Sequence, residues 1–519
     1  MYGNKTFRKM NRYLRSTATE SNIASNFLGR IWGSLLSLLF LPLYLRFLGI
    51  EAYGLIGFHV TFLGLISVLD LGLSTTLNRE LAKRSSTGVP DPNSRDLIRT
   101  FELIYWGGGI FVGAALLLLS PWIAKNWIRS HAVSPGTIRN VMAIMGVLIA
   151  IQWPSSLYIG GLMGTQRQVL LNIVLSITAT FQSAGVVMVL WLVSPTIEAY
   201  FFWQILVALL QTTFLRGLLL KSLPPSNHAG AFSKGLLATH WKFSAGMTAI
   251  TLLATILTQA DKVILSRLLP LKSFGYYILS FNVASVLGFI AYPFFVALFP
   301  KFSQLAQELR EREVSSLYHA GAQFVSALLL PAGLVLLLFP REILSIWLRD
   351  PETAANTYRI LRLVACGTVL NALMVLPFNL QLAYGWTRLS LLKNIIAVAL
   401  FLPSLFFVTS RWGAIGAASL WILLNLGYLA FEVPLMHRRL LTGEAKLWYI
   451  QDVGLPSGIS ILVFGASRYL FPDSLPPVPS LIWIIITTLL ASALSLSAMP
   501  RTRAWVRGRL KRGPHLPAL

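Results

Sequence analysis

Cysteine and charge are both scarce in this sequence. One of its 519 residues is a cysteine, Cys366, and only 12% are Asp, Glu, Lys or Arg, about half the charged share of a soluble globular protein. One cysteine cannot form an intrachain disulfide, which excludes a secreted disulfide scaffold, and we interpret Cys366 as a small buried hydrophobic residue. With 55% hydrophobic residues and a mean hydropathy of +0.67, the composition also excludes a soluble enzyme and a disordered chain.

Motifs for several kinds of chemistry are missing as well. The sequence has no G-x-x-x-x-G-K-[ST] motif, so no P-loop ATPase powers it. Its seven histidines are scattered and, with one cysteine, give no metal-ligand spacing. Glycine-rich segments at 107–113 and 160–164 lie inside hydrophobic runs, and we expect them to allow close helix packing. We therefore expect no cofactor and no bound metal.

Long hydrophobic runs are what the sequence has in abundance. A run of about 20 apolar residues is long enough to cross a hydrocarbon core of about 30 Å as a helix. We therefore expect an all-α polytopic membrane protein with about fourteen transmembrane helices. The expected spans lie near 25–48, 54–77, 101–124, 138–163, 168–193, 197–220, 243–268, 274–299, 315–339, 360–384, 389–409, 413–436, 453–471 and 481–499.

The net charge of +24 has an explanation that does not need nucleic acid as a partner. Cytoplasmic loops of membrane proteins collect Lys and Arg. If both termini are cytoplasmic, the inner segments carry 29 basic residues and the outer segments 12. We interpret the first span as an uncleaved anchor. The basic tail at 501–512 either binds acidic membrane lipids or simply fixes the topology.

An internal repeat divides the chain into two halves. The segment that begins at Arg46 recurs at Arg267, and Pro154, Gly164 and Arg216 recur at a similar shift of 221 to 223 residues. We expect two pseudo-symmetric six-helix lobes, at 1–221 and 243–441, joined by a cytoplasmic linker at 222–242. Residues 442–519 add two helices and the basic tail. A cleft between parallel repeats is where transporters place their substrate.

Polar residues follow one face of the first helix in each half. They recur at helical spacing at 22, 26, 30, 34 and 37, and again at 244, 248, 251, 255, 258, 262 and 266. Each stripe holds a cation, and a cation inside a bilayer costs about 2.5–3.5 kcal/mol, which makes it a functional candidate. We expect the stripes to line a wet cavity whose substrate-binding residues are Arg30, Lys262, Asn26, Thr255, Thr258 and Gln259. Alternatively, the stripes only hold neighbouring helices together.

Three acidic residues lie well inside predicted spans: Asp70, Asp261 and Glu432. They are the candidates for ion coupling, with Asp261 first because it adjoins the polar stripe. Each has a structural alternative. Asp70 lies at a depth similar to that of Arg30 and can pair with it. Asp261 can form a fixed ion pair with a Lys or Arg. Glu432 can extend its carboxylate to the inner membrane interface.

Several short motifs resemble a known family. They are R-x-L-G from Arg46, Y-G at 53–54, D-L-G-L from Asp70 and N-R at 78–79, with further similar stretches up to about residue 440. They resemble the polysaccharide transporter family, the O-antigen-type flippases of the multidrug/oligosaccharidyl-lipid/polysaccharide exporter superfamily. Drug exporters of that superfamily commonly carry an acid in the first span, and peptidoglycan lipid flippases an Arg-Asp pair. This span holds Arg30 and no acid.

The resemblance implies a two-lobed helical transporter, not an enzyme, in the bacterial inner membrane. It implies alternating-access transport of polyprenyl-pyrophosphate-linked oligosaccharide for O-antigen, capsule or exopolysaccharide biosynthesis. The lipid-linked glycan is the implied partner, and polysaccharide polymerases or chain-length proteins are candidate partners. The alternatives are an ion-coupled multidrug exporter and a membrane glycosyltransferase or polysaccharide polymerase. Such an enzyme needs sizeable outer loops, whereas the longest here, near 340–359, has only about 20 residues.

The charge bias predicts that both termini face the cytoplasm. A reporter domain that is active only in the cytoplasm should therefore be active when it is fused before residue 1 or after residue 519. A periplasm-specific reporter active at either end would contradict this topology.

Overall fold

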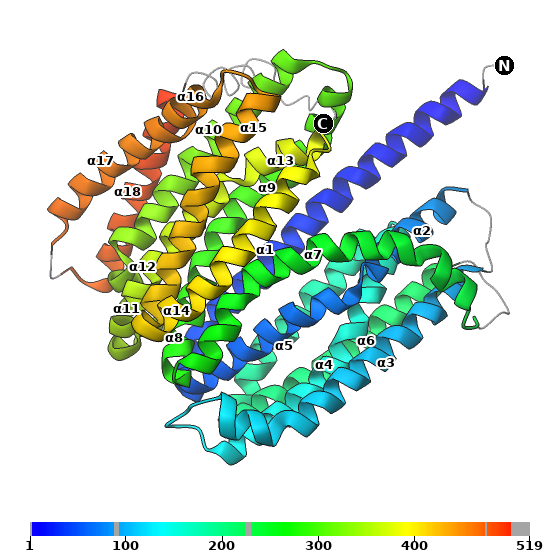
Figure 1. The fold of residues 1–519 in the computed structure, drawn as a ribbon, viewed down its shortest axis with the longest axis horizontal. Coiled ribbons are helices and arrows are strands. Elements are labelled where there is room, and N and C mark those ends of the chain that lie inside the picture. The colour runs from blue at the N-terminus through cyan, green and yellow to red at the C-terminus, as the bar shows by residue number, and fades with distance from the viewer. Residues whose placement is uncertain (1–2, 88–92, 224–229, 473–474, 500–519) are drawn as a thin grey trace. The chain divides into compact units, whose positions relative to one another are not determined.

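The computed structural model describes residues 3–87, 93–223, 230–472 and 475–499, and these contain helices and no β-sheet (Figure 1). The described chain divides into two compact units. Unit 1 runs up to Gln259 and includes Pro270–Lys272, and unit 2 comprises Ala260–Leu269 and the residues from Ser273 onward. The boundary between the units falls inside one helix, α7 (Lys234–Leu268).

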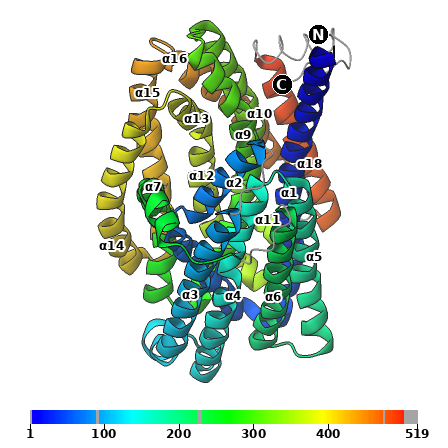
Figure 2. The same cartoon turned by 90° about the vertical axis from the view of Figure 1, so that its right-hand side faces the viewer.

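Unit 1 is built around a central helix. Its helices are α1 (Gly3–Ile66), α2 (Leu73–Thr87), α3 (Asn93–Trp122), α4 (Pro135–Gly164), α5 (Gln168–Leu192) and α6 (Ile197–Ser222), with the short η1 (Ser67–Asp70) and η2 (Ile123–Trp127). α4 packs against α2, α3 and α6, and α1 packs against α5. α3, α4 and α6 run side by side in both views (Figure 2).

Glycines allow α4 to approach its neighbours closely. A Cβ built on Gly113 of α3 would lie 2.6 Å from the carbonyl oxygen of Gly146, and one on Gly160 would lie 2.6 Å from that of Ser74 in α2. Real Cβ atoms do not come that close, so larger residues would separate the helices. Both glycine-rich segments are therefore helix-packing sites, as the sequence predicted.

Unit 2 contains more and shorter helices. They are α8 (Leu271–Ala284), α9 (Gly288–Gln307), α10 (Glu311–Leu338), α11 (Pro340–Leu348), α12 (Pro351–Leu373), α13 (Val375–Ala383), α14 (Thr387–Gly427), α15 (Val433–Leu440), α16 (Ala445–Leu447), α17 (Leu455–Leu470) and α18 (Pro477–Ala498). The short η3 (Ser285–Leu287), η4 (Tyr428–Glu432) and η5 (Trp448–Gly454) connect some of them. α10 packs against α9, α12, α17 and α18, and α12 packs against α14.

Local sequence signals fix several helix ends. Asp350 caps α12 by accepting from the backbone N–H groups of Glu352 and Thr353, and Pro351 occupies the first helical position. Ser134 and Pro135 begin α4 in the same way. Gly49, at φ +77°, and Gly413, at φ +57°, divide α1 and α14 into two helical parts each. These positive φ angles favour glycine, because other L-residues rarely adopt them.

All fourteen expected spans fall on helical segments, so the all-α polytopic class is confirmed. Among the described residues, eleven helical stretches are long and apolar enough to cross a membrane, and two of them, Ile31–Asp70 and Thr387–Leu440, each overlap two of our spans. The count of fourteen stays approximate, and the division into two six-helix lobes stays a prediction. Some spans are interrupted: the one at 54–77 breaks after Asp70, where Leu71 and Gly72 both have positive φ.

The two ends of α17 are anchored differently. Just before α17 begins, the fully buried Asp452 contacts His319 Nδ1 and accepts from Gln323 Nε2 at 2.9 Å, both on α10. His319 Nε2 lies 3.0 Å from Glu444 Oε2. In the last turn of α17, Arg468 Nη1 lies 2.6 Å from Glu342 Oε1, but Arg468 is 44% exposed. Removing the partner of a buried hydrogen-bonding group costs about 1–3 kcal/mol, whereas exposed ion pairs contribute about 0–1 kcal/mol.

We predict that Asp452→Ala lowers the free energy of unfolding much more than Glu342→Ala does. The first variant removes the buried carboxylate that His319 and Gln323 both contact. The second removes the partner of an Arg468 side chain that is already 44% exposed. Reversible denaturation of both variants in the same detergent measures the difference. Equal losses of stability would contradict a buried anchor at the start of α17.

Candidate functional site

The predicted polar stripe on α7 is only partly described. Thr255 is buried, Gln259 is half-buried and Thr258 is exposed. The Thr258 hydroxyl donates to the carbonyl oxygen of Ala254 at 2.9 Å, a bond within its own helix. A Cβ on Gly64 of α1 would lie 2.8 Å from Gln259 Cδ, so Gln259 packs closely against α1. The predicted stripe residues at 244, 248 and 251 lie outside the residues whose side chains are described.

In the first stripe, Asn26 is engaged with α5. Its Nδ2 donates to Gln168 Oε1 at 2.7 Å, and its Oδ1 accepts from Asn172 Nδ2 at 2.5 Å. Such bonds between membrane helices hold the helices together, which is the alternative that the sequence left open. The side chain of Arg30 lies outside the described residues, so its predicted role and its pairing with Asp70 stay predictions.

Lys262 and Asp261 form a buried cluster in unit 2. Lys262 Nζ lies 3.2 Å from Asp261 Oδ1 and 3.7 Å from the centroid of the Phe281 ring. The Tyr277 hydroxyl donates to Asp261 Oδ2 at 2.7 Å. The two charged residues are only 7% and 6% exposed. The fixed ion pair that the sequence left open for Asp261 is therefore present, and its partner is the adjacent lysine.

Glu432 belongs to a second buried cluster in unit 2. Its carboxylate accepts from Lys393 Nζ at 2.6 and 2.7 Å and from Gln381 Nε2 at 2.8 Å. Lys393 Nζ also lies 4.7 Å from the centroid of the Tyr428 ring. Because Glu432 is only 3% exposed, the alternative that it extends to the interface is wrong. Its negative charge is instead matched by a cation on α14.

Asp70 lies at the end of η1, where the helical path of the chain breaks. Its Oδ1 accepts from the Tyr105 hydroxyl, and its Oδ2 accepts from the Ser74 hydroxyl at 2.8 Å. The αL conformation of Leu71 and Gly72 starts a new helix after Asp70. The break turns the D-L-G-L motif into a corner, with the carboxylate beside a cavity.

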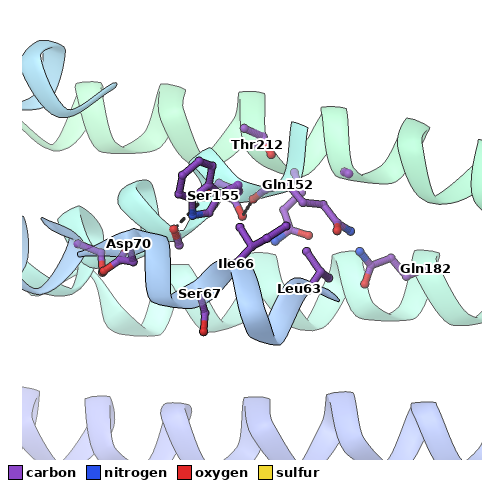
Figure 3. Close-up of a pocket in the computed structure, with 13 residues that line it drawn as sticks. Leu63, Ile66, Ser67, Asp70, Gln152, Ser155, Gln182 and Thr212 are labelled. Atoms are coloured by element: carbon purple, nitrogen blue, oxygen red, sulfur yellow. Dashed lines mark hydrogen bonds between the residues drawn. The ribbon is translucent and has the colours of Figure 1, made fainter. Parts of the chain in front are cut away.

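That cavity has a volume of about 530 Å³ and lies entirely within unit 1. Figure 3 shows Leu63 and Ile66 in its middle, Asp70 towards one end and Gln182 towards the other. The lining residues come from α1, η1, α2, α4, α5 and α6. They are Leu63, Ile66, Ser67, Asp70, Ser74, Gln152, Trp153, Ser155, Ser156, Gln182, Ala208, Gln211 and Thr212. The cavity wall therefore combines amides, hydroxyls and one carboxylate with apolar surface.

Sequence reasoning found only Asp70 among these lining residues. A signal was present, because positions 63, 66, 67, 70 and 74 share one helical face, as do 208, 211 and 212. Glutamine is also expensive to bury in a hydrocarbon phase, so Gln152, Gln182 and Gln211 deserved the same scrutiny as charged residues. Which helices would bring them together was not visible in the sequence.

The described residues contain no group of three or more His, Cys, Asp or Glu side chains arranged to hold a metal ion. Two of the buried carboxylates, those of Asp261 and Glu432, lie against a lysine.

Comparison with known proteins identifies the family. The family model described as "Polysaccharide biosynthesis protein" matches residues 20–306, and a MatE model matches 247–407. The chain is 22% identical over 406 residues to the Shigella flexneri protein named "Putative O-antigen transporter", which covers 77% of this chain and 93% of that protein.

Solved structures show the same fold. The lipid II flippase MurJ in an inward closed conformation superposes with a TM-score of 0.67 at 13% identity, covering 92% of this chain and 98% of that one. An inward-facing multidrug resistance MATE family transporter gives a TM-score of 0.61 at 11% identity, covering 79% and 96%. The family model matches more than half of the chain, so the chain belongs to the polysaccharide biosynthesis protein family, and its fold is that of the MurJ and MATE structures.

Proposed function

We propose that the chain is a flippase that moves polyprenyl-pyrophosphate-linked oligosaccharide across the bacterial inner membrane for cell-surface polysaccharide biosynthesis. The observation that carries the proposal is the family match over residues 20–306. The similarity along 93% of a protein named as an O-antigen transporter supports the same assignment. The expected partners are the lipid-linked glycan and the enzymes that polymerise it.

The chemistry of this substrate explains why charged residues occur in membrane helices. A pyrophosphate-linked glycan is anionic and strongly hydrated, so it needs a polar, cationic path, whereas its polyprenyl chain can stay in lipid. In this proposal Arg30 and Lys262 bind the pyrophosphate, and Asn26, Thr255, Thr258 and Gln259 line the path. Lys262 would exchange its bond to Asp261 for one to the substrate as the transporter alternates between inward and outward access.

An ion-coupled multidrug exporter is the second candidate. The MatE match over residues 247–407 favours it, and the buried acids supply sites for cations. The two functions predict opposite effects of a charge reversal. Arg30→Glu should impair movement of an anionic lipid and improve export of a cationic drug.

We predict that purified chain in liposomes moves a fluorescent undecaprenyl-pyrophosphate-linked tetrasaccharide between leaflets, and that Lys262→Ala or Arg30→Ala abolishes this movement. Each variant removes a cation that the anionic headgroup needs. The assay is the fraction of lipid accessible to a membrane-impermeant quencher. Arg411→Ala, which removes an exposed cation at the α14 kink, is the control and should keep the wild-type rate.

Movement at the wild-type rate in both the Lys262 and Arg30 variants would remove the cationic path from the account. No movement by the wild-type chain, above that of empty liposomes, would contradict the flippase itself.

We also predict that an ion gradient or removal of the substrate drives transport, with Asp261 as the first candidate for the coupling site. Protonation or sodium binding at Asp261 would release Lys262 and leave it free to meet the anion. The measurement is the flipping rate under an imposed pH or sodium gradient, for wild type and Asp261→Asn. Asp70→Asn and Glu432→Gln test the other two candidates. If Asp261→Asn responds to both gradients as wild type does, this coupling role is wrong.

A further inference from the structure

We infer that the cavity of unit 1 is a binding pocket for uncharged sugar residues. The inference rests on the proposed function for its biological setting, because it names the part of the lipid-linked glycan that this pocket would hold. It rests on the structure for its chemistry, because the described residues that line the cavity all belong to a single compact unit.

The hydrogen-bonding groups of the wall match those of a sugar. A sugar hydroxyl both donates and accepts, so its binding site must offer both kinds of partner. The amides of Gln152, Gln182 and Gln211 each provide an NH₂ donor and a carbonyl acceptor, and the Asp70 carboxylate provides further acceptor capacity. Hydroxyl groups from four helical elements complete the set: Ser67 of η1, Ser74 of α2, Ser155 and Ser156 of α4, and Thr212 of α6.

The wall also has apolar surface and an unused donor. Leu63, Ile66 and Trp153 line the cavity and can pack against the C–H faces of a pyranose ring. The Trp153 Nε1 is buried and has no hydrogen-bond partner in the part of the chain that the structure describes. A buried donor of this kind is normally satisfied by a ligand or by water.

The size and shape of the cavity fit a small organic molecule. Its volume of about 530 Å³ lies within the range of about 300–1,000 Å³ that is typical of ligand pockets. Asp70 and Gln182 lie towards opposite ends of the cavity (Figure 3). The polar groups are therefore spread along an elongated site, as an oligosaccharide requires, rather than gathered around one point.

The same geometry argues against two other ligands. A bare metal cation needs several oxygen atoms that converge within about 2.0–2.6 Å, which side chains at opposite ends of a cavity do not provide. A phosphate or a sugar acid needs a cation, but the described lining residues include no Lys, Arg or His, and the Asp70 carboxylate would repel an anion. An uncharged, hydroxyl-rich ligand is what remains.

The test uses the full chain in nanodiscs and a free tetrasaccharide of neutral hexoses as the probe, with binding measured by calorimetry. The double variant Gln182→Leu/Gln211→Leu should bind the probe at least tenfold more weakly, because it removes two amides that each contribute a hydrogen bond. Gln204→Leu is the matched control: it lies on α6, seven residues before Gln211, and does not line the cavity. It should bind as wild type does.

A second probe tests the charge of the pocket. A tetrasaccharide with one hexuronic acid should bind the wild-type chain more weakly than the neutral probe does. In the Asp70→Asn variant the affinities for the two probes should be closer to each other. Melting temperatures of all variants in nanodiscs exclude loss of folding as the cause of weaker binding.

The outcome separates this inference from the proposed function. If wild type binds the neutral probe and the double variant loses it, the pocket is confirmed even where liposomes show no flipping. The inference is overturned if wild type does not bind the neutral probe, or if the folded double variant binds it as tightly as Gln204→Leu does. Flipping by wild type would still support the flippase in either case.

Discussion

The hydrocarbon core of a membrane offers no hydrogen bonds, and the arrangement of this chain follows from that constraint. Every polar group inside a span must find its partner within the protein. The described backbone meets the requirement by being helical along most of the membrane spans, with breaks such as the one at Leu71 and Gly72. The buried charged side chains meet it in compact clusters: Asp261 with Lys262 and Tyr277, Glu432 with Lys393 and Gln381, and Asp452 with His319.

Both units pair buried carboxylates with cations, and in unit 1 Glu102, only 3% exposed, lies 2.5 Å from Arg216 Nε. In unit 2, Asp261 and Glu432 lie against lysines, and Asp452 contacts His319. In unit 1, amides and hydroxyls also surround a cavity, and Asp70 is the one charged residue among the described residues that line it. We interpret the carboxylate–lysine pairs as suited to ion coupling, and the cavity of unit 1 as suited to a neutral ligand.

Features set by local sequence were predictable, and features set by helix contacts were not. Hydropathy located the spans, and the glycine-rich segments of α3 and α4 were correctly interpreted as packing sites, because both signals act within one helix or its face. The partner of Glu432 was missed because Lys393 lies 39 residues away in the chain, and only the fold brings the two side chains together. The cavity was missed because its three glutamines are single residues on three helices, and only the folded structure brings them together.

The central claim is that the chain delivers a lipid-linked glycan to the outer face of the inner membrane. The most direct measurement compares cells with and without the chain, using a membrane-impermeant lectin to count lipid-linked glycan on the outer face of spheroplasts. The account predicts that deletion removes the outer-face glycan while the total pool of lipid-linked glycan stays the same or rises. An unchanged outer-face fraction in the deletion strain, with no second transporter of this family present, would contradict it.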